Sequence, residues 1–263
     1  MMCFKKKIPT AITSTHVYVG MGLNDYMGSA NDLRGCVNDI NNEVKKLNRD
    51  FPEFQCLKYF DSQVTTQFFM SEMRRILSEV SALATKEGKQ GFVYLKYSGH
   101  GTQIPSSTEP NGYNEALYLY NGPLIDDNIY LLQQETPDNV TVLAKFDSCF
   151  SGDIGSKCPE YRKSRFMAMQ GVPKMRHAVN HIAKTDRGQT WIIMSGCGEE
   201  ETSADAYIEG QYQGAFTWAN MKSYGRGVLY SQEISDTMGR LFLNHFKQNP
   251  EISGPYHEKT FVN

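Results

Sequence analysis

The sequence is 263 residues long, which fits one large α/β domain or two small ones. Hydrophobic residues make up 40% and charged residues 21% of the chain, and this composition excludes an intrinsically disordered protein. The formal net charge of -2, from 27 basic and 29 acidic side chains, gives no reason to expect nucleic-acid binding. No apolar stretch approaches the roughly 18 residues that cross a bilayer, so we expect no membrane association.

The cysteines and the N-terminus predict the compartment. Six cysteines are scattered along the chain without a CxxC pair, which disfavours a zinc ribbon or a disulfide scaffold. Basic residues near the N-terminus are not followed by an apolar segment, which argues against a secretory signal. We therefore expect a cytoplasmic protein, with residues 1–15 as an N-terminal extension and residues 16–263 as a single domain.

Hydrophobic spacing predicts strands that alternate with helices. The predicted strands cover residues 16–23, 54–60, 91–101, 141–152 and 190–198. Four helices are predicted. The first carries the apolar positions from Leu33 to Leu47, and the second carries those from Phe69 to Leu83 and ends near Gly88. The third is short and starts at Asp126, and the fourth covers residues 231–246. A loop rich in Gly, Ser and Pro is predicted between residue 101 and the helix at Asp126. Strands joined through helices need crossover connections, so the fold class is α/β with a central, mostly parallel sheet of about six strands flanked by helices.

Three predicted strands end in small residues next to a reactive side chain, in SGHG, DSCFSG and SGCG. In open parallel sheets the functional site lies beyond the carboxyl ends of the strands. Cys149 is a candidate nucleophile, because a nearby imidazole such as that of His100 lowers a thiol's pKa and protonates the leaving amine. Gly101 and Gly152 are candidates for backbone oxyanion binding. The alternative is a buried structural cysteine beside a packed histidine.

Side chains two apart on a strand share a face, which groups Ser98 with His100 and Asp147 with Cys149 if the strands continue that far. Cys36 and Asp39 share a helix face by their spacing of three. Carboxylates beside the nucleophile would form an anionic pocket for an Arg or Lys side chain. The alternative for Asp39 is a solvated helix residue.

The segments LRGCVND, YSGHGTQ, FDSCFSG and SGCGEEETSADA, followed by GAFT, resemble the metacaspases and their prokaryotic relatives, the orthocaspases. The 49 positions between His100 and Cys149 also resemble the interval of about 50 in caspases. The resemblance runs from about His16 to the end of the chain. It implies a caspase-like three-layer fold, a Cys149–His100 dyad, cleavage after Arg or Lys, and a monomer. It also implies that Cys36, Asp39, Ser98 and Asp147 surround the basic side chain of the substrate.

Two features depart from that family. Phe150 follows the cysteine where a histidine is usual, and we do not expect this change to abolish catalysis. The sequence has no Pro/Gln-rich or zinc-finger prodomain, so we do not expect recruitment through such a region.

Many metacaspases are activated by calcium, which takes six or more oxygen ligands. Asp126 and Asp127 match the family's acidic pair, and Asp153 lies just past the nucleophile, but Asn114 stands where an aspartate is expected. Calcium is the one cofactor that the sequence suggests, and no organic cofactor is expected. Alternatively, Asp126 and Asp127 only favour the start of a helix.

A basic linker covers about residues 157–187, with eight basic residues against two acidic ones. Caspase-like enzymes are often cut in this linker, and a solvated basic loop is the alternative for any single position. The candidate self-cleavage residues are Lys157, Arg162, Lys163, Arg165, Lys174 and Arg176.

Together these features predict a cysteine endopeptidase that hydrolyses proteins or peptides after Arg or Lys. Two alternatives are a catalytically inactive caspase-like module that binds or regulates, and a caspase-like peptidase that prefers a different residue before the cleaved bond.

Overall fold

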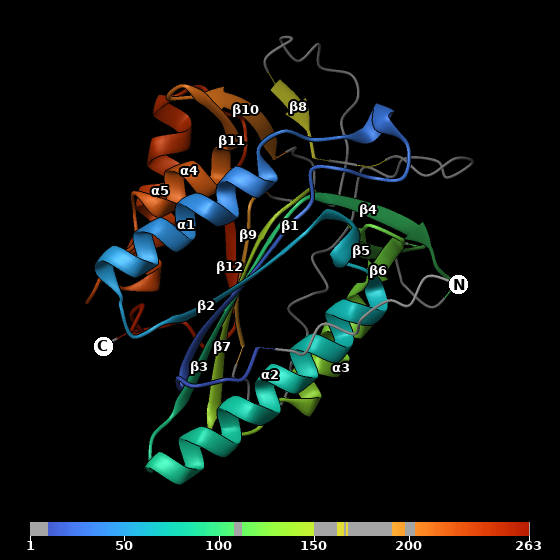
Figure 1. The fold of residues 1–263 in the computed structure, drawn as a ribbon. Coiled ribbons are helices and arrows are strands. Elements are labelled where there is room, and N and C mark those ends of the chain that lie inside the picture. Colours follow the sequence, from blue (N-terminus) through green and yellow to red (C-terminus); the bar gives the residue numbers. More distant parts are fainter. Residues whose placement is uncertain are drawn as a thin grey trace.

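The computed structural model describes residues 10–107, 112–149, 162–165, 167, 191–197 and 203–262. A six-stranded sheet with the order β12-β9-β7-β3-β1-β2 forms the centre. Five of its strands are parallel, and only β12 is antiparallel. Helices α1, α4 and α5 cover one face and α2 and α3 cover the other (Figure 1). The predicted α/β class with a mostly parallel sheet is therefore confirmed.

The central sheet is accompanied by two small antiparallel sheets near the carboxyl ends of its strands, with the orders β4-β5-β6 and β11-β10-β8 (Figure 1). The strands of the central sheet are β1 (His16–Gly22), β2 (Gln55–Phe60), β3 (Gly91–Ser98), β7 (Val140–Asp147), β9 (Trp191–Ser195) and β12 (Glu251–Ser253). Those of the small sheets are β4 (His100–Pro105), β5 (Tyr113–Leu119), β6 (Gly122–Ile125), β8 (Arg162–Ser164), β10 (Ala204–Ile208) and β11 (Gln211–Gly214).

The helices are α1 (Cys36–Asp50), α2 (Thr66–Glu87), α3 (Asp126–Glu135), α4 (Ala215–Met221) and α5 (Tyr230–Leu243), with short 3-10 turns at Ser29–Asn31 and Asp61–Gln63. None of the helices described has the length and apolar character that crossing a membrane requires. Helix α2 ends as predicted, because Gly88 adopts a left-handed conformation with φ of 62° that suits a residue without a side chain.

Helix α1 begins later than the hydrophobic spacing predicts. Leu33 lies outside it, and the helix starts at Cys36. The side-chain oxygen of Asn24 accepts hydrogen bonds from the backbone N–H groups of Cys36 at 2.9 Å and Val37 at 3.3 Å. Because the first N–H groups of a helix have no partner inside it, these two bonds define its start.

The prediction of a loop between residue 101 and Asp126 is wrong, since β4, β5 and β6 form an antiparallel sheet there. The Gly, Ser and Pro residues that favoured a loop lie among these short strands and hide their alternating pattern in the sequence. Leu117, Leu119 and Leu124 project from this sheet into the main apolar cluster, so burial of one face stabilises it.

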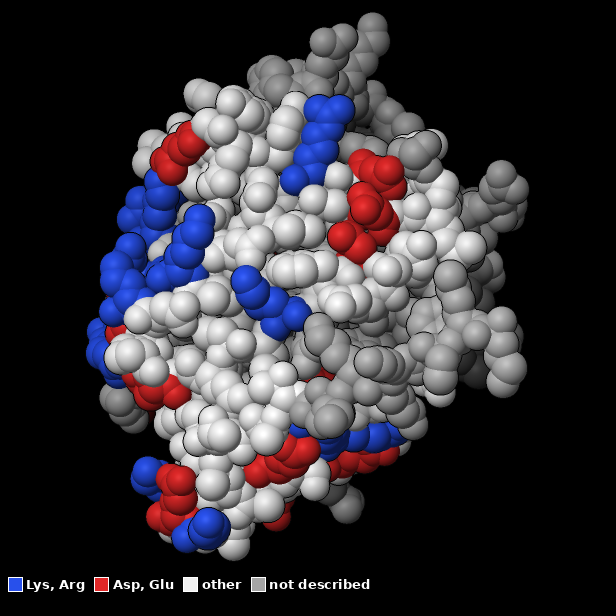
Figure 2. All heavy atoms as spheres, viewed as in Figure 1, with Lys and Arg blue, Asp and Glu red and all other residues white. Residues whose placement is uncertain are grey.

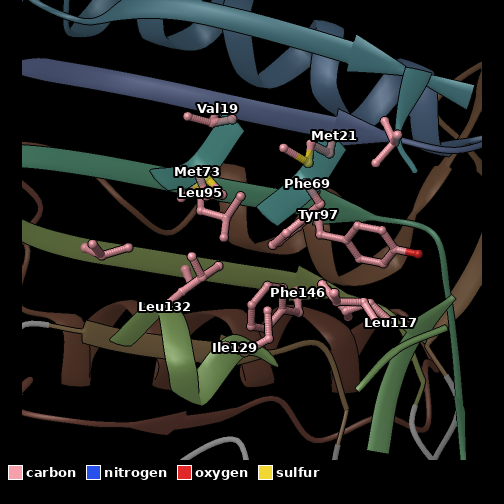
Figure 3. Packing of buried hydrophobic residues seen from close by; sticks show 14 of the residues in the cluster. Val19, Met21, Phe69, Met73, Leu95, Tyr97, Leu117, Ile129, Leu132 and Phe146 are labelled. Carbon is pink, nitrogen blue, oxygen red and sulfur yellow. The ribbon is translucent and has the colours of Figure 1, made fainter. Parts of the chain in front are cut away.

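The main apolar cluster, which includes Leu95, Tyr97 and Phe146, packs against paired strands β3 and β7. Figure 3 shows Leu95 and Tyr97 of β3 and Phe146 of β7 packed between α2 and α3, with Phe69 and Ile129 among their neighbours. Each fully buried side chain of this size contributes roughly 1.5–3 kcal/mol relative to an exposed one. This packing holds the strand ends in a fixed register, which positions the site.

Candidate active site

Strands β3 and β7 end side by side, with Ser98 paired to Asp147. The predicted continuation of both strands is wrong, because β3 stops at Ser98 and β7 at Asp147. The N–H of Gly99 donates to the Asp147 carbonyl at 3.3 Å, and the chain then turns into β4. His100 and Cys149 therefore lie just beyond adjacent strand ends.

The backbone at Gly101 packs directly against Cys149. A Cβ atom at Gly101 would overlap the Cys149 carbonyl group, whose carbon would lie 2.7 Å away. A glycine is required here by this close approach. The contact brings the residue after His100 against the candidate nucleophile, although 49 positions separate the two side chains in the sequence.

The imidazole and backbone of His100 are held by three neighbouring residues. Its Nε2 lies 2.6 Å from the carbonyl oxygen of Asn31, which can only accept a hydrogen bond, so Nε2 carries a proton. The Tyr26 hydroxyl accepts from the His100 backbone N–H at 2.8 Å, and the Tyr97 hydroxyl donates to the His100 carbonyl at 2.8 Å. In the neutral ring, Nδ1 is consequently the nitrogen that can take up a proton.

Replacing Tyr26 with Phe is expected to lower kcat about tenfold while leaving KM nearly unchanged. The buried N–H of His100 would lose its acceptor, which costs roughly 1–3 kcal/mol and loosens the imidazole. Steady-state kinetics on a peptide substrate, with thermal unfolding in parallel, would measure both effects. Tyr18→Phe is the matched control, because no described residue hydrogen-bonds the buried Tyr18 hydroxyl. An equal loss of kcat in both variants would contradict the positioning role.

Cys149 is buried, and its Sγ lies 2.6 Å from the backbone nitrogen of Ser203 and 3.3 Å from the Ser203 carbonyl. Two backbone N–H groups converge beside it on one oxygen, the carbonyl of Arg165. Gly101 donates to this oxygen at 2.8 Å and Cys149 at 3.4 Å. A pair of N–H donors aimed at one carbonyl is the arrangement that stabilises an oxyanion. Gly152 lies outside the described residues.

Three buried carboxylates form a pocket beside this carbonyl, from Asp39 of α1, Asp147 at the end of β7 and Asp205 of β10. We call Asp39, Asp147, Asp205 and the hydroxyl of Ser98 the carboxylate pocket. Figure 2 shows basic and acidic side chains on the outer face, with several of them side by side; the pocket carboxylates, in contrast, are buried. The alternative of a solvated Asp39 is wrong.

The guanidinium of Arg165 fills the carboxylate pocket. Its NH1 donates to Ser98 Oγ at 2.7 Å and lies 3.2 Å from Asp147 Oδ1. Its NH2 donates to Asp39 Oδ2 at 2.8 Å and to Asp205 Oδ1 at 3.0 Å. Ser98 in turn donates to Asp39 Oδ2 at 2.6 Å. The planar fork of an arginine can satisfy several oxygens at once, and these contacts use it.

Sequence reasoning missed Asp205, although it lies in the SADA segment that carried the family resemblance. Its carboxylate also accepts from the backbone N–H groups of Arg34 at 2.8 Å and Gly35 at 3.0 Å. Asp205 therefore joins β10 to the chain just before α1, which a pattern of hydrophobic spacing cannot reveal.

The charged groups of the pocket shift one another's pKa values. Burial raises the pKa of Asp39 to about 6, against the opposing effect of Arg165 and with a further increase from Asp147. Burial also acts to raise the pKa of Asp147, but Arg165 and the buried ammonium of Lys96 outweigh it, so that this pKa is lowered. Asp147 accepts from Ser203 Oγ at 2.5 Å and from the backbone N–H of Thr217 at 3.0 Å, which also favours its charged form.

We expect binding of a guanidinium to the pocket to weaken as the pH falls towards about 6. The pKa of Asp39 is about 6 with the guanidinium of Arg165 in the pocket and is higher when the pocket is empty, so protonation of the empty site competes with binding from above pH 6. Titration of ethylguanidinium into a Cys149→Ala, Arg165→Ala protein should give a Kd about tenfold higher at about pH 5 than at about pH 7. The same protein with Asp39→Asn should bind more weakly and lose most of this pH dependence; an unchanged profile would contradict the assignment.

The chain around Arg165 runs through the site as an added strand. Strand β8 pairs antiparallel with β10, and the N–H of Arg165 donates to the Ser203 carbonyl at 3.1 Å. For Arg165 the alternative of a solvated basic loop is wrong, since its side chain is fully buried. Arg162 and Lys163 contribute backbone to β8. The other self-cleavage candidates, Lys157, Lys174 and Arg176, lie outside the described residues.

Cys36 is buried next to the pocket, and burial raises its pKa well above the usual value, so its thiol is neutral there.

The proposed calcium ligands are only partly described. Asp126 and Asp127 open α3, and Asp126 Oδ1 accepts from the Asp127 N–H at 3.1 Å. Asp153 lies outside the described residues. Within the described ranges no three His, Cys, Asp or Glu side chains group to hold a metal.

The arrangement of strands is shared with two solved structures. Protein GSU0716 from Geobacter sulfurreducens superposes with a TM-score of 0.66 at 21% identity, over 94% of this chain and 99% of that chain. Caspase-1 from Spodoptera frugiperda superposes with a TM-score of 0.59 at 12% identity, over 94% of this chain and 90% of that chain. The fold is therefore caspase-like, as predicted.

Residues 17–156 match the family described as metacaspase, peptidase C14 domain. The chain belongs to this family of cysteine peptidases, which confirms the resemblance seen in the sequence. Metacaspase-3 of Trypanosoma brucei brucei is 29% identical over 188 residues, which cover 65% of this chain and 52% of that protein. Metacaspase-1 of Coccidioides immitis is 26% identical over 204 residues, which cover 61% and 44%. The chain thus spans about half the length of these curated relatives.

Proposed function

We propose that the protein is a cysteine endopeptidase that cleaves after Arg or Lys, with Cys149 as nucleophile and His100 as acid and base. The observation that supports this most directly is the position of Arg165. Its side chain lies in the carboxylate pocket while its carbonyl oxygen faces the N–H groups of Gly101 and Cys149. A substrate residue before the cleaved bond would make the same two sets of contacts.

In this mechanism the Cys149 thiolate attacks the carbonyl carbon after its proton has passed to His100 Nδ1. The carbonyl oxygen becomes an oxyanion and is stabilised by the N–H groups of Gly101 and Cys149. The C–N bond then breaks, the imidazolium returns its proton to the departing amine, and a thioester remains. His100 then takes a proton from water, whose oxygen attacks the thioester carbon; the C–S bond breaks, the acid leaves, and the Cys149 thiolate regains its proton from the imidazolium.

Within the proposed specificity, Arg is favoured over Lys. The guanidinium of Arg165 reaches Ser98, Asp39 and Asp205 simultaneously through NH1 and NH2. An ammonium offers three donors from a single nitrogen and cannot match that fork geometry. A neutral or acidic side chain would leave the three buried carboxylates uncompensated, which disfavours such substrates.

Self-processing belongs to the same proposal, with the bond after Arg165 as its site. Of the six candidate residues, Arg165 is the one whose side chain the structure describes, and it fills the pocket. Before that cut, the chain's own arginine competes with any substrate for the pocket.

A panel of fluorogenic peptides that end in Arg, Lys or Asp tests the activity, on the wild-type chain and on Cys149→Ala. We expect the Arg peptide to be cut fastest, the Lys peptide more slowly, and the Cys149→Ala protein to be inactive. Absence of hydrolysis in the wild-type chain would favour an inactive binding module. Fastest cutting of the Asp peptide would mean that the carboxylate pocket is assigned to the wrong role.

Calcium activation belongs to the proposal through Asp126 and Asp127, and it needs further oxygen ligands beside these two carboxylates. A chelator added to the peptide panel tests it. Activity that survives chelation and does not rise with added calcium would remove calcium from the proposal.

We further propose a monomer in the cytoplasm. The short antiparallel strand β12 pairs with β9 over Glu251–Ser253 and so covers that edge of the central sheet. The four described cysteines Cys36, Cys56, Cys149 and Cys197 carry free thiols, which fits a reducing compartment. Light scattering of the purified chain and fractionation of its host cell are the respective tests.

A further inference from the structure

The segment that fills the active site continues past Arg165. Its next described residue, Met167, is also bound to the site by hydrogen bonds. The N–H of Met167 donates to the carbonyl of Gly101 at 2.9 Å. The hydroxyl of Thr102 donates to the carbonyl of Met167 at 2.7 Å. Gly101 therefore bonds to the chain on both sides of the bond after Arg165, through its N–H and through its C=O.

The side chain of Met167 is buried as well. It is 5% exposed and belongs to the main apolar cluster, although it lies in no described helix or strand. Thr102, whose hydroxyl binds its carbonyl, is fully buried on β4. The second position after the proposed cleaved bond thus combines two backbone hydrogen bonds with an apolar surface that is closed to solvent.

We infer that Gly101, Thr102 and this apolar surface form a subsite for the second residue after the cleaved bond, and that the subsite selects Met or Leu there. This inference rests on the proposed function, because it assumes that substrates bind as residues 162–165 and 167 do. An apolar side chain would be removed from water at this position. A charged one would be buried without a partner, which is strongly unfavourable.

Thr102 contributes to the subsite through its hydroxyl. A substrate residue that presents its carbonyl as Met167 does would receive the same hydrogen bond, whatever its side chain. Thr102 therefore strengthens binding of the chain beyond the cleaved bond, whereas the apolar surface supplies the selection among side chains. Substrates that end at the cleaved bond use neither feature.

The test compares peptides of the sequence Gly-Ser-Arg-Phe-X-Ala, with Met, Leu, Ser or Asp at X. Their Kd values are measured on a Cys149→Ala chain that also carries Arg165→Ala and Met167→Ala, so that its own segment no longer fills the site. We expect the Met and Leu peptides to bind roughly 10- to 100-fold more tightly than the Asp peptide, with Ser in between. Equal affinities within a factor of two, or tighter binding of the Asp peptide, would overturn the inference.

Kinetics on the wild-type chain separate this inference from the proposed function. The rate on the Met peptide is divided by the rate on an Arg-aminomethylcoumarin substrate, which has no residue after the cleaved bond. Thr102→Val should lower this ratio about fivefold, whereas Thr237→Val, in a buried hydrogen bond within α5, should not change it. An unchanged ratio in Thr102→Val would contradict the role of Thr102. If the wild-type chain hydrolyses neither substrate, the proposed function fails, and the Kd values alone still decide the subsite.

Discussion

Replacing Asp147 with Asn is expected to reduce the preference for Arg over citrulline at the cleaved bond by about 10²- to 10³-fold. Citrulline has the shape of Arg without its charge, so the ratio of the two kcat/KM values isolates the electrostatic contribution. Removing one partner of a buried ion pair costs about 3–5 kcal/mol, which corresponds to a change of this size. Asn keeps the size of the side chain, with one oxygen to accept from Thr217 and an amide NH2 group that can donate to the Ser203 hydroxyl.

Asp147 is the most informative carboxylate to change, because it is held from several sides. It accepts from the Thr217 hydroxyl at 2.5 Å and from Ser203 Oγ at 2.5 Å, and it faces the guanidinium at 3.2 Å. These bonds fix it at the end of β7 whether or not the pocket is filled. The loss of preference should therefore come from the missing charge and not from a displaced side chain.

The control is Asp236→Asn on α5, where the carboxylate accepts one exposed hydrogen bond from Gln232. Circular dichroism and thermal unfolding show whether the Asp147→Asn protein keeps the fold. A folded variant that retains the wild-type ratio of Arg to citrulline would refute the role of the carboxylate pocket. A uniform loss of rate on both peptides would instead indicate damage to the site of attack.

Strong periodic patterns explain what the sequence could predict. The buried runs of β1, β3 and β7 and the long apolar face of α2 each dominate their segment, so the central sheet and its order of elements follow from local spacing. The face shared by Cys36 and Asp39 on α1 follows in the same way. The grouping of Ser98 with Asp147 is a direct consequence of two parallel strands that end in register.

Features that depend on distant pairing could not be predicted. Strands β8, β10 and β11 have three to five residues each, and β8 pairs with β10 through residues distant in the sequence, such as Ser164 with Ala204. The turn at Gly99 redirects the chain into β4, so the argument from shared strand faces does not apply to His100. Asp205 reaches the pocket only because β10 lies beside the start of α1. Local spacing contains no information about any of these three contacts.

Replacing Arg165 with Ala is expected to abolish the cut between residues 165 and 166, with a fall of at least about 10³-fold in its rate. The variant loses the group that holds the segment in the carboxylate pocket, so the bond is no longer held at Cys149. Arg165→Lys should still be cut, but more slowly, because an ammonium keeps the charge without the fork. Intact-mass spectrometry measures the fragments, and the new N-terminus should be Phe166.

The same variant separates processing from inhibition. In the uncut wild-type chain the tethered arginine is present at a high effective concentration, so peptide hydrolysis should begin after a lag that ends with self-cleavage. In Arg165→Ala the pocket is open from the start, so hydrolysis of an Arg peptide should begin without a lag and without any cut at this bond. Arg226→Ala is the control, since its guanidinium lies at the surface against Glu53. If Arg165→Ala still gave the wild-type fragments, another bond would be the processing site. If the lag persisted in this variant, Arg165 would not be the group that blocks the pocket.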